Sequence, residues 1–171
     1  MIGSFTNLEP NNLKEPPTVI SGKDSLKYHG VEYVVFGEED VVNSRAFEIR
    51  YEYHCSPFKH AEIWNDLLLV GFEGHFYIYD LLNKKNILAL KMDGYFGHLY
   101  MHNNFFYVAD AAKLYCINDK AHIIWESDDL GVDGVIVDDF NEDKIYGQGE
   151  LDPPGGWRDF VLDLNKGKII K

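Results

Sequence analysis

Carboxylate side chains crowd the stretch from residue 126 to residue 152. Ten Asp and Glu residues fall there against a single cation, Lys144, and they account for most of the formal net charge of -12. These carboxylates are Glu126, Asp128, Asp129, Asp133, Asp138, Asp139, Glu142, Asp143, Glu150 and Asp152. Such a group can bind a divalent cation, can attract a basic partner, or can form an ordinary solvated surface.

Part of this stretch is close to the pattern of a calcium-binding loop. Asp139, Asn141 and Asp143, with Glu150 at the twelfth position, nearly match D-x-[DN]-x-[DN]-G-x5-E. The sixth position is Lys144, where the loop needs a glycine, and the flanking residues have the pattern of strands instead of helices. We therefore favour a turn over a calcium site and predict no metal and no cofactor.

The histidines and cysteines offer weaker candidates for chemistry. His98 and His102 are four residues apart, which on a strand means about 13 Å, so both can hardly ligate one zinc ion. His54 and Cys55 are adjacent, which places their side chains on opposite faces of a strand and separates a base from its nucleophile. We predict no catalytic residue from these patterns.

The elements that must position the carboxylates belong to a repeat of roughly forty residues. Each copy has an apolar run, a turn rich in Asn and Asp, and a second apolar run that starts at Leu67, Phe105 or Lys144, 38 and 39 residues apart. In the third run, apolar and polar residues alternate with period two, and a fourth run follows it. The alternating runs are residues 75–80, 113–118 and 159–164. Each copy is therefore predicted to form a four-stranded antiparallel meander.

Residues 60–171 resemble the blades of β-propellers of the pyrroloquinoline-quinone-enzyme and WD types in this arrangement of runs and turns. The resemblance implies an all-β fold, with antiparallel four-stranded meanders in a small or incomplete propeller-like array. The three blade-like copies are residues 60–92, 98–127 and 134–171. The sequence lacks the Trp-Asp dipeptide of WD blades and a quinone-binding signature, so the resemblance implies no particular function.

The rest of the chain is expected to extend the same domain. Residues 17–58 contain two further strand patterns and should form an N-terminal β region, giving one β domain over residues 17–171. Residues 1–16 contain two prolines and no clear periodicity, and we expect a flexible arm there.

The third copy carries an insertion between its second and third strands. Residues 148–157, QGELDPPGGW, stand where the other copies have FEGH and ADAA. Insertions in repeat proteins gather on the loops of one face, and that face often binds. Trp157 either fills a gap beside the last blade or, with Glu150, Asp152 and Arg158 around it, forms a binding hot spot.

The composition narrows the class of partner. A hydrophobic content of 46% over 171 residues supports a folded core, and the pI near 4.9 disfavours nucleic acid and anionic membranes as partners. The sequence shows neither a secretory signal nor an apolar run long enough to cross a bilayer, so we expect a cytoplasmic protein. A homodimer is one way to cover the edge of such an array.

We expect a non-catalytic protein-binding module with an acidic face, whose partner is a basic protein; an immunity protein that neutralises a basic toxin is one such case. The expected contact residues are Asp128, Asp129, Asp138, Asp139, Asp143, Glu150, Asp152, Trp157 and Arg158. Two alternatives stay open. One is a small-molecule or carbohydrate-binding protein, a hydrolase included, with its site at residues 148–158. The other is a scaffold fragment of a larger propeller.

Overall fold

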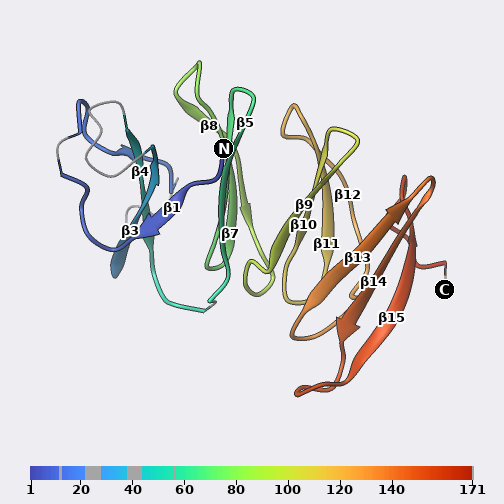
Figure 1. Ribbon diagram of the computed structural model, residues 1–171. Helices are drawn as coiled ribbons and strands as arrows, with labels where there is room; N and C mark the ends of the chain where they lie inside the picture. The colour runs from blue at the N-terminus through green and yellow to red at the C-terminus, as the bar shows by residue number, and fades with distance from the viewer. Residues whose placement is uncertain (12, 22–27, 38–43, 56, 171) are drawn as a thin grey trace. The chain divides into compact units, whose positions relative to one another are not determined.

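The structure, a computed structural model, is built from β-strands (Figure 1). It describes residues 1–11, 13–21, 28–37, 44–55 and 57–170. The chain divides into two compact units, residues 1–90 and residues 91–171. Within the described ranges, no helix is long and apolar enough to cross a membrane. The fold is all-β, as the sequence predicts.

The first sheet of unit 1 contains β1 (Ser4–Thr6), β2 (Thr18–Val19), β3 (Gly30–Phe36) and β4 (Arg45–Tyr51), in the order β1-β3-β4-β2. Strands β3 and β4 are antiparallel, whereas β2 runs parallel to β4. Alternate residues of β3 and β4, among them Val34, Phe36, Phe47 and Ile49, are buried on one face. Residues 22–27, 38–43 and 56 of the expected N-terminal β region lie outside the described residues.

Residues 1–6 differ from the expected flexible arm. The Gly3 amide donates to the carbonyl of Ala61, and the Ile63 amide donates to the carbonyl of Met1. Ser4–Thr6 pairs with β3, and the Phe5 ring stacks on the ring of Phe72 with 5.9 Å between centroids. Paired backbone groups and a partly buried aromatic ring hold this segment on the sheets.

The second sheet of unit 1 is a meander of β5 (Lys59–Trp64), β6 (Leu67–Phe72), β7 (His75–Asp80) and β8 (Lys85–Lys91). Its buried side chains Leu68, Val70, Phe72, Tyr77 and Tyr79 form one core with those of the first sheet. Unit 1 is thus two sheets packed around a shared apolar cluster.

Unit 2 also contains two sheets. The first is the meander of β9 (His98–His102), β10 (Phe105–Ala109), β11 (Leu114–Asn118) and β12 (Ile123–Glu126). The second has three strands, β13 (Val135–Asn141), β14 (Lys144–Glu150) and β15 (Trp157–Asp163). One core joins them, with Tyr107, Leu114 and Trp125 from the first sheet and Ile145 and Leu162 from the second.

The repeat predicted from the sequence is confirmed at its second strands, since β6, β10 and β14 begin at Leu67, Phe105 and Lys144. Its fourth strand forms in the first two copies as β8 and β12. In the third copy, the described part of the fourth run forms no strand and makes an isolated bridge between Ile169 and Leu162. The third blade-like copy is therefore a three-stranded sheet with one further bridge.

The connection between the second and third strands lengthens from copy to copy. It spans residues 73–74 in the first copy, 110–113 in the second and 151–156 in the third. The last loop is shorter than the ten-residue insertion inferred from the sequence, because Glu150 and Trp157 pair with each other as strand residues.

Candidate functional site

The β13–β15 sheet has two faces of different character. Val135, Val137, Ile145, Phe160 and Leu162 point into the core of unit 2. Side chains of the opposite side, which we call the outer face, are exposed or half-buried. Pairing in the ladders assigns to the outer face Ile136, Asp139, Tyr146, Gln148, Glu150, Trp157, Asp159 and Val161. The outer face therefore mixes apolar and acidic groups.

Trp157 and Glu150 form the loop end of this face. They lie directly opposite each other on β15 and β14. The Trp157 ring also covers Gly134, since a Cβ added at Gly134 would lie only 2.8 Å from its Cη2 atom. The residue is nevertheless 37% exposed. One part of Trp157 thus packs on Gly134, and the rest of the residue faces solvent.

The 151–156 loop closes on itself beside this pair. The Leu151 amide donates to the carbonyl of Gly156, and the Gly156 amide donates to the carbonyl of Asp152. The Glu150 carboxylate accepts a hydrogen bond of 2.7 Å from the Gly155 amide. The side chain of Asp152 is exposed at the tip. The loop thus continues the β14–β15 hairpin as an ordered turn.

Arg158 does not join Trp157 and Glu150. It lies opposite Gly149, so it projects to the other side of the sheet from Trp157. No described carboxylate forms an ion pair with it. The sequence-based expectation that Glu150, Asp152, Trp157 and Arg158 converge is therefore wrong for Arg158, because adjacent residues of a strand alternate between faces.

Asp138 and Asp139 lie at a β-bulge in β13. The register with β14 passes from Val137↔Gly147 to Asp139↔Tyr146, which leaves Asp138 as the extra residue. Both carboxylates are consequently exposed, although neighbours on a regular strand would face opposite sides. The bulge doubles the acidic groups that this strand presents to solvent.

Asp143 occupies the tip of the β13–β14 hairpin, where Glu142 and Asp143 form the turn between the paired residues Asn141 and Lys144. Glu150 ends the same strand that Lys144 begins, six residue steps away, which corresponds to roughly 20 Å. Asp139, Asn141, Asp143 and Glu150 therefore do not surround one point, and the described residues hold no group of three or more acidic, His or Cys side chains arranged for a metal ion.

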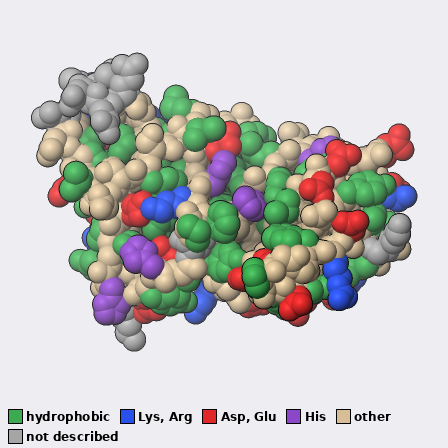
Figure 2. Space-filling view, turned by 60° about the horizontal axis from the view of Figure 1, so that its bottom comes forward, with side chains coloured by type: hydrophobic (Ala, Val, Ile, Leu, Met, Phe, Trp, Pro, Cys, Tyr) green, Lys and Arg blue, Asp and Glu red, His purple; other side chains and the backbone are tan. Residues whose placement is uncertain are grey.

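Asp128 and Asp129 lie on the connection from β12 to β13, and both are exposed. Asp128 is 3.0 Å from the Lys168 ammonium, and both side chains of this ion pair are exposed to solvent. The nine residues predicted from the sequence thus lie in three places of unit 2: this connection, the bulge with its hairpin tip, and the loop end. In Figure 2, acidic side chains (red) are interspersed with apolar ones (green) over the right-hand part, where β13–β15 lie.

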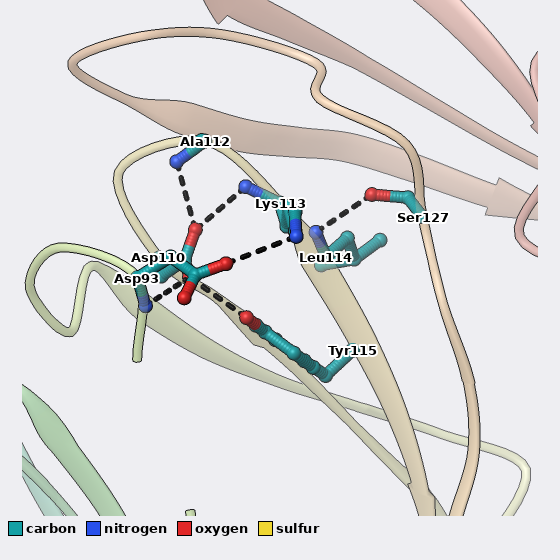
Figure 3. Close-up of polar contacts among 7 residues, drawn as sticks. All are labelled: Asp93, Asp110, Ala112, Lys113, Leu114, Tyr115 and Ser127. Atoms are coloured by element: carbon teal, nitrogen blue, oxygen red, sulfur yellow. Dashed lines mark hydrogen bonds and ion pairs between the residues drawn. The ribbon is translucent and has the colours of Figure 1, made fainter. Parts of the chain in front are cut away.

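A buried carboxylate, Asp110, organises the first sheet of unit 2 (Figure 3). Its side chain is 1% exposed. Oδ1 accepts from the amides of Ala112 at 2.7 Å and Lys113 at 2.6 Å, while Oδ2 accepts from the Tyr115 hydroxyl at 3.0 Å and the Asp93 amide at 3.3 Å. Donors surround both oxygens, so this carboxylate fixes the β10–β11 connection and leaves little room for another ligand.

The His54–Cys55 pair in unit 1 is organised by Glu73. Its carboxylate is 2.8 Å from His54 Nδ1 and accepts from the Cys55 amide at 2.5 Å. Burial, with the Glu73 carboxylate beside it, raises the pKa of the Cys55 thiol to about 11. The thiol is therefore protonated at neutral pH, the opposite of an activated nucleophile.

A feature that the sequence analysis did not predict is a cavity of about 510 Å³ in unit 1. Three separate segments line it: residues 14–18, the start of β4 and the turn after β7. None of the nine predicted residues is among its walls. Sequence patterns could not indicate it, because its side chains come from segments about thirty residues apart that share no motif.

Comparison with known proteins supports the fold and leaves the family open. No family model matches the sequence, and no curated protein matches it. Among solved structures, BamB from Moraxella catarrhalis is similar with a TM-score of 0.55 and 11% identity, over 100% of this chain and 51% of that one. Hydrazine synthase of Kuenenia stuttgartiensis is similar with a TM-score of 0.55 and 12% identity, over 97% and 49%. The chain thus spans about half the length of the structures it matches, and it has a β-propeller-like fold.

Proposed function

We propose that the protein is a non-catalytic binding module that uses the outer face of the β13–β15 sheet to contact a basic protein. The observation that carries the proposal is the Trp157–Glu150 pair. It sets a tryptophan that is 37% exposed beside a carboxylate on two paired strands. Tryptophan anchors with polar neighbours are typical of the residues that dominate protein–protein interfaces.

The negative charge of the outer face favours a basic protein as its partner. Among the outer-face carboxylates, Asp139, Glu150 and Asp159 have no described lysine or arginine within ion-pair distance. Unpaired carboxylates in one region repel anions and attract cationic surfaces, which raises association rates at low salt. A small basic protein, for example a toxin that this chain neutralises, fits a surface of this sign.

The mixed character of the outer face also supports a protein partner. Ile136, Tyr146 and Val161 are half-buried there between Asp139 and Glu150. A partner that covers them would bury apolar area in the centre while the carboxylates contact its basic groups at the rim. Arg158, which projects to the opposite face, is not part of this contact surface.

The test is affinity capture from the source organism with three forms of the protein as bait. The first is the unmodified chain, and the second is D138K/D139K, which reverses the bulge charges. The third is D66K/D119K, a control that changes net charge equally at two exposed turns that are not part of the β13–β15 sheet. We expect a basic protein that the first and third forms capture, that the second loses, and that salt releases. Equal capture by both double variants, or a partner that is not basic, would contradict the proposal.

A second candidate function is that of a scaffold piece of a larger propeller. The observation that favours it is that the chain spans about half the length of the propeller structures it matches. In that case a second copy of this chain would cover the apolar groups of the outer face, and a basic protein would not. Light scattering between about 1 µM and about 100 µM separates the two, since a scaffold role requires dimers in this range and a binding module works as a monomer.

A further inference from the structure

The cavity of unit 1 combines an apolar floor with a cationic rim. Its floor includes Phe47 and Tyr79, which are 4% and 5% exposed and whose rings meet edge to face at 5.9 Å. Lys14, Arg45 and Lys84 are among the residues that line it. The volume of about 510 Å³ lies within the range of small-molecule sites in proteins.

The charge at this cavity is opposite to that of the protein as a whole. Among the described residues, three cationic ones line it against one carboxylate, Glu15, in a chain whose net charge is -12. Arg45 and Lys84 are exposed, and no described carboxylate forms an ion pair with either side chain. Two cations from different segments therefore line one cavity, and neither is paired with a described carboxylate.

Strand pairing and hydrogen bonds within a turn position residues that line the cavity. Thr18 pairs with Phe47, which holds Thr18 beside the start of β4. Lys84 has a positive φ of 50° in the turn that connects β7 and β8. This turn is held by Asp80, whose carboxylate accepts from the amides of Leu82 and Asn83. The backbone on all three sides of the cavity is thus anchored by hydrogen bonds.

Tyr79, which lines the cavity, carries a hydroxyl group. No described residue makes a hydrogen bond to its hydroxyl, although buried tyrosines usually find a partner. Burial and the neighbouring Asp80 carboxylate raise the pKa of Tyr79 above its ordinary value, so the hydroxyl keeps its proton and can donate to a ligand. A donor at the floor complements the cations at the rim.

We infer that this cavity binds a small organic anion whose apolar part contacts Phe47 and Tyr79 and whose anionic group pairs with Arg45 and Lys84. A phosphate monoester and a carboxylate both have this chemistry. Arg45 can bind two oxygens of such a group at once, while Lys84 acts as a point charge. This site is separate from the outer face, and it does not depend on the proposed function of that surface.

The test uses defined probes and the whole chain. Amide chemical shifts are followed by NMR during titration with phenyl phosphate and with benzoate, which separate the two anion types. Three control probes each change one property: inorganic phosphate has no aromatic ring, benzyl alcohol has no charge, and benzylamine carries a positive charge. We expect saturable shifts at the amides of Arg45, Phe47 and Lys84, with an anionic aromatic probe binding at least about tenfold more tightly than benzyl alcohol.

Two double variants complete the experiment. R45Q/K84Q removes the cations of the rim and should weaken phenyl phosphate or benzoate binding about tenfold. K120Q/K166Q removes two exposed charges in turns of unit 2 and should leave affinity within about twofold. Y79F removes only the hydroxyl and should weaken binding about threefold. Three results would each overturn the proposal: no saturable shift below about 10 mM, benzylamine binding as tight as that of the anions, or equal affinities of the two double variants.

Discussion

Trp157 lies directly across from Glu150 at the end of the β14–β15 hairpin, and its ring covers the backbone of Gly134. The absence of a side chain at Gly134 allows this close approach. One edge of the indole is thereby fixed, while 37% of the residue is exposed to solvent. A ring that is already held in place loses little conformational entropy when a partner covers it.

The first prediction concerns this ring. Replacing Trp157 with alanine should weaken binding of the captured partner by about 2 kcal/mol or more, because exposed tryptophans of this kind dominate interface energies. Isothermal titration measures the loss. Y53A is the matched control, since Tyr53 is 56% exposed on unit 1. An equal loss of affinity in both variants would mean that Trp157 is no anchor.

The second prediction concerns Asp110. D110A removes a carboxylate that accepts four hydrogen bonds, and it should reduce the free energy of unfolding by roughly 3 to 5 kcal/mol. Y115F removes one donor and should cost roughly 1 kcal/mol. Urea denaturation followed by circular dichroism measures both. A D110A protein as stable as the unmodified chain would show that water satisfies these donors just as well.

The third prediction compares two glycines of the third copy. A Cβ at Gly149 would lie 1.8 Å from the carbonyl oxygen of Leu130, so G149A should cost more than about 3 kcal/mol. A Cβ at Gly155 would meet nothing within 4 Å, although its φ is +96°, and G155A should cost about 1 kcal/mol. Thermal unfolding of the two variants should therefore rank G149A well below G155A, and the reverse order would contradict the close approach of residue 130 to β14.

The fourth prediction concerns alkaline pH. The Tyr95 hydroxyl donates to the Asp133 carbonyl at 2.6 Å, and burial together with Asp133 raises its pKa from 10.0 to about 12. The folded state thus keeps a proton that the unfolded state releases near pH 10, so this stabilisation is complete below pH 10 and is lost as pH rises through about 12. Y95F should be less stable by roughly 1 kcal/mol at neutral pH.

Urea denaturation at about pH 7, pH 9 and pH 11.5 checks the sign of this effect. The gap between the unmodified chain and Y95F should be constant at the first two values and smaller at the third. A gap that widens with pH would mean that the folded state stabilises the tyrosinate.

The strands of the repeats could be predicted because local signals coincide there. Asn-rich turns precede Leu67 and Phe105, and apolar alternation follows, so turn chemistry and periodicity mark the same boundaries. β1 has neither signal: its three residues pair only because the chain returns to β3. Its Phe5 could not be recognised as part of the core from a segment without periodicity.

The candidate site residues also divide into features that the sequence locates and features that only the fold reveals. The sequence locates Trp157 and Glu150 in an insertion, but only the register shows that they face each other and that Arg158 opposes Gly149. The cavity that Arg45 and Lys84 line is harder still, since it depends on three segments whose proximity is a tertiary property.

The bulge at Asp138 has a consequence for sequence evolution. Val137 pairs with Gly147 and Asp139 pairs with Tyr146, so the two partners on β14 are already consecutive. Loss of the Asp138 codon would therefore join Val137 to Asp139 in a regular ladder and leave Phe140 on the side it now occupies. At this position one residue can be lost without turning the strand over, and loss of Asp138 itself makes the surface less negative by one charge.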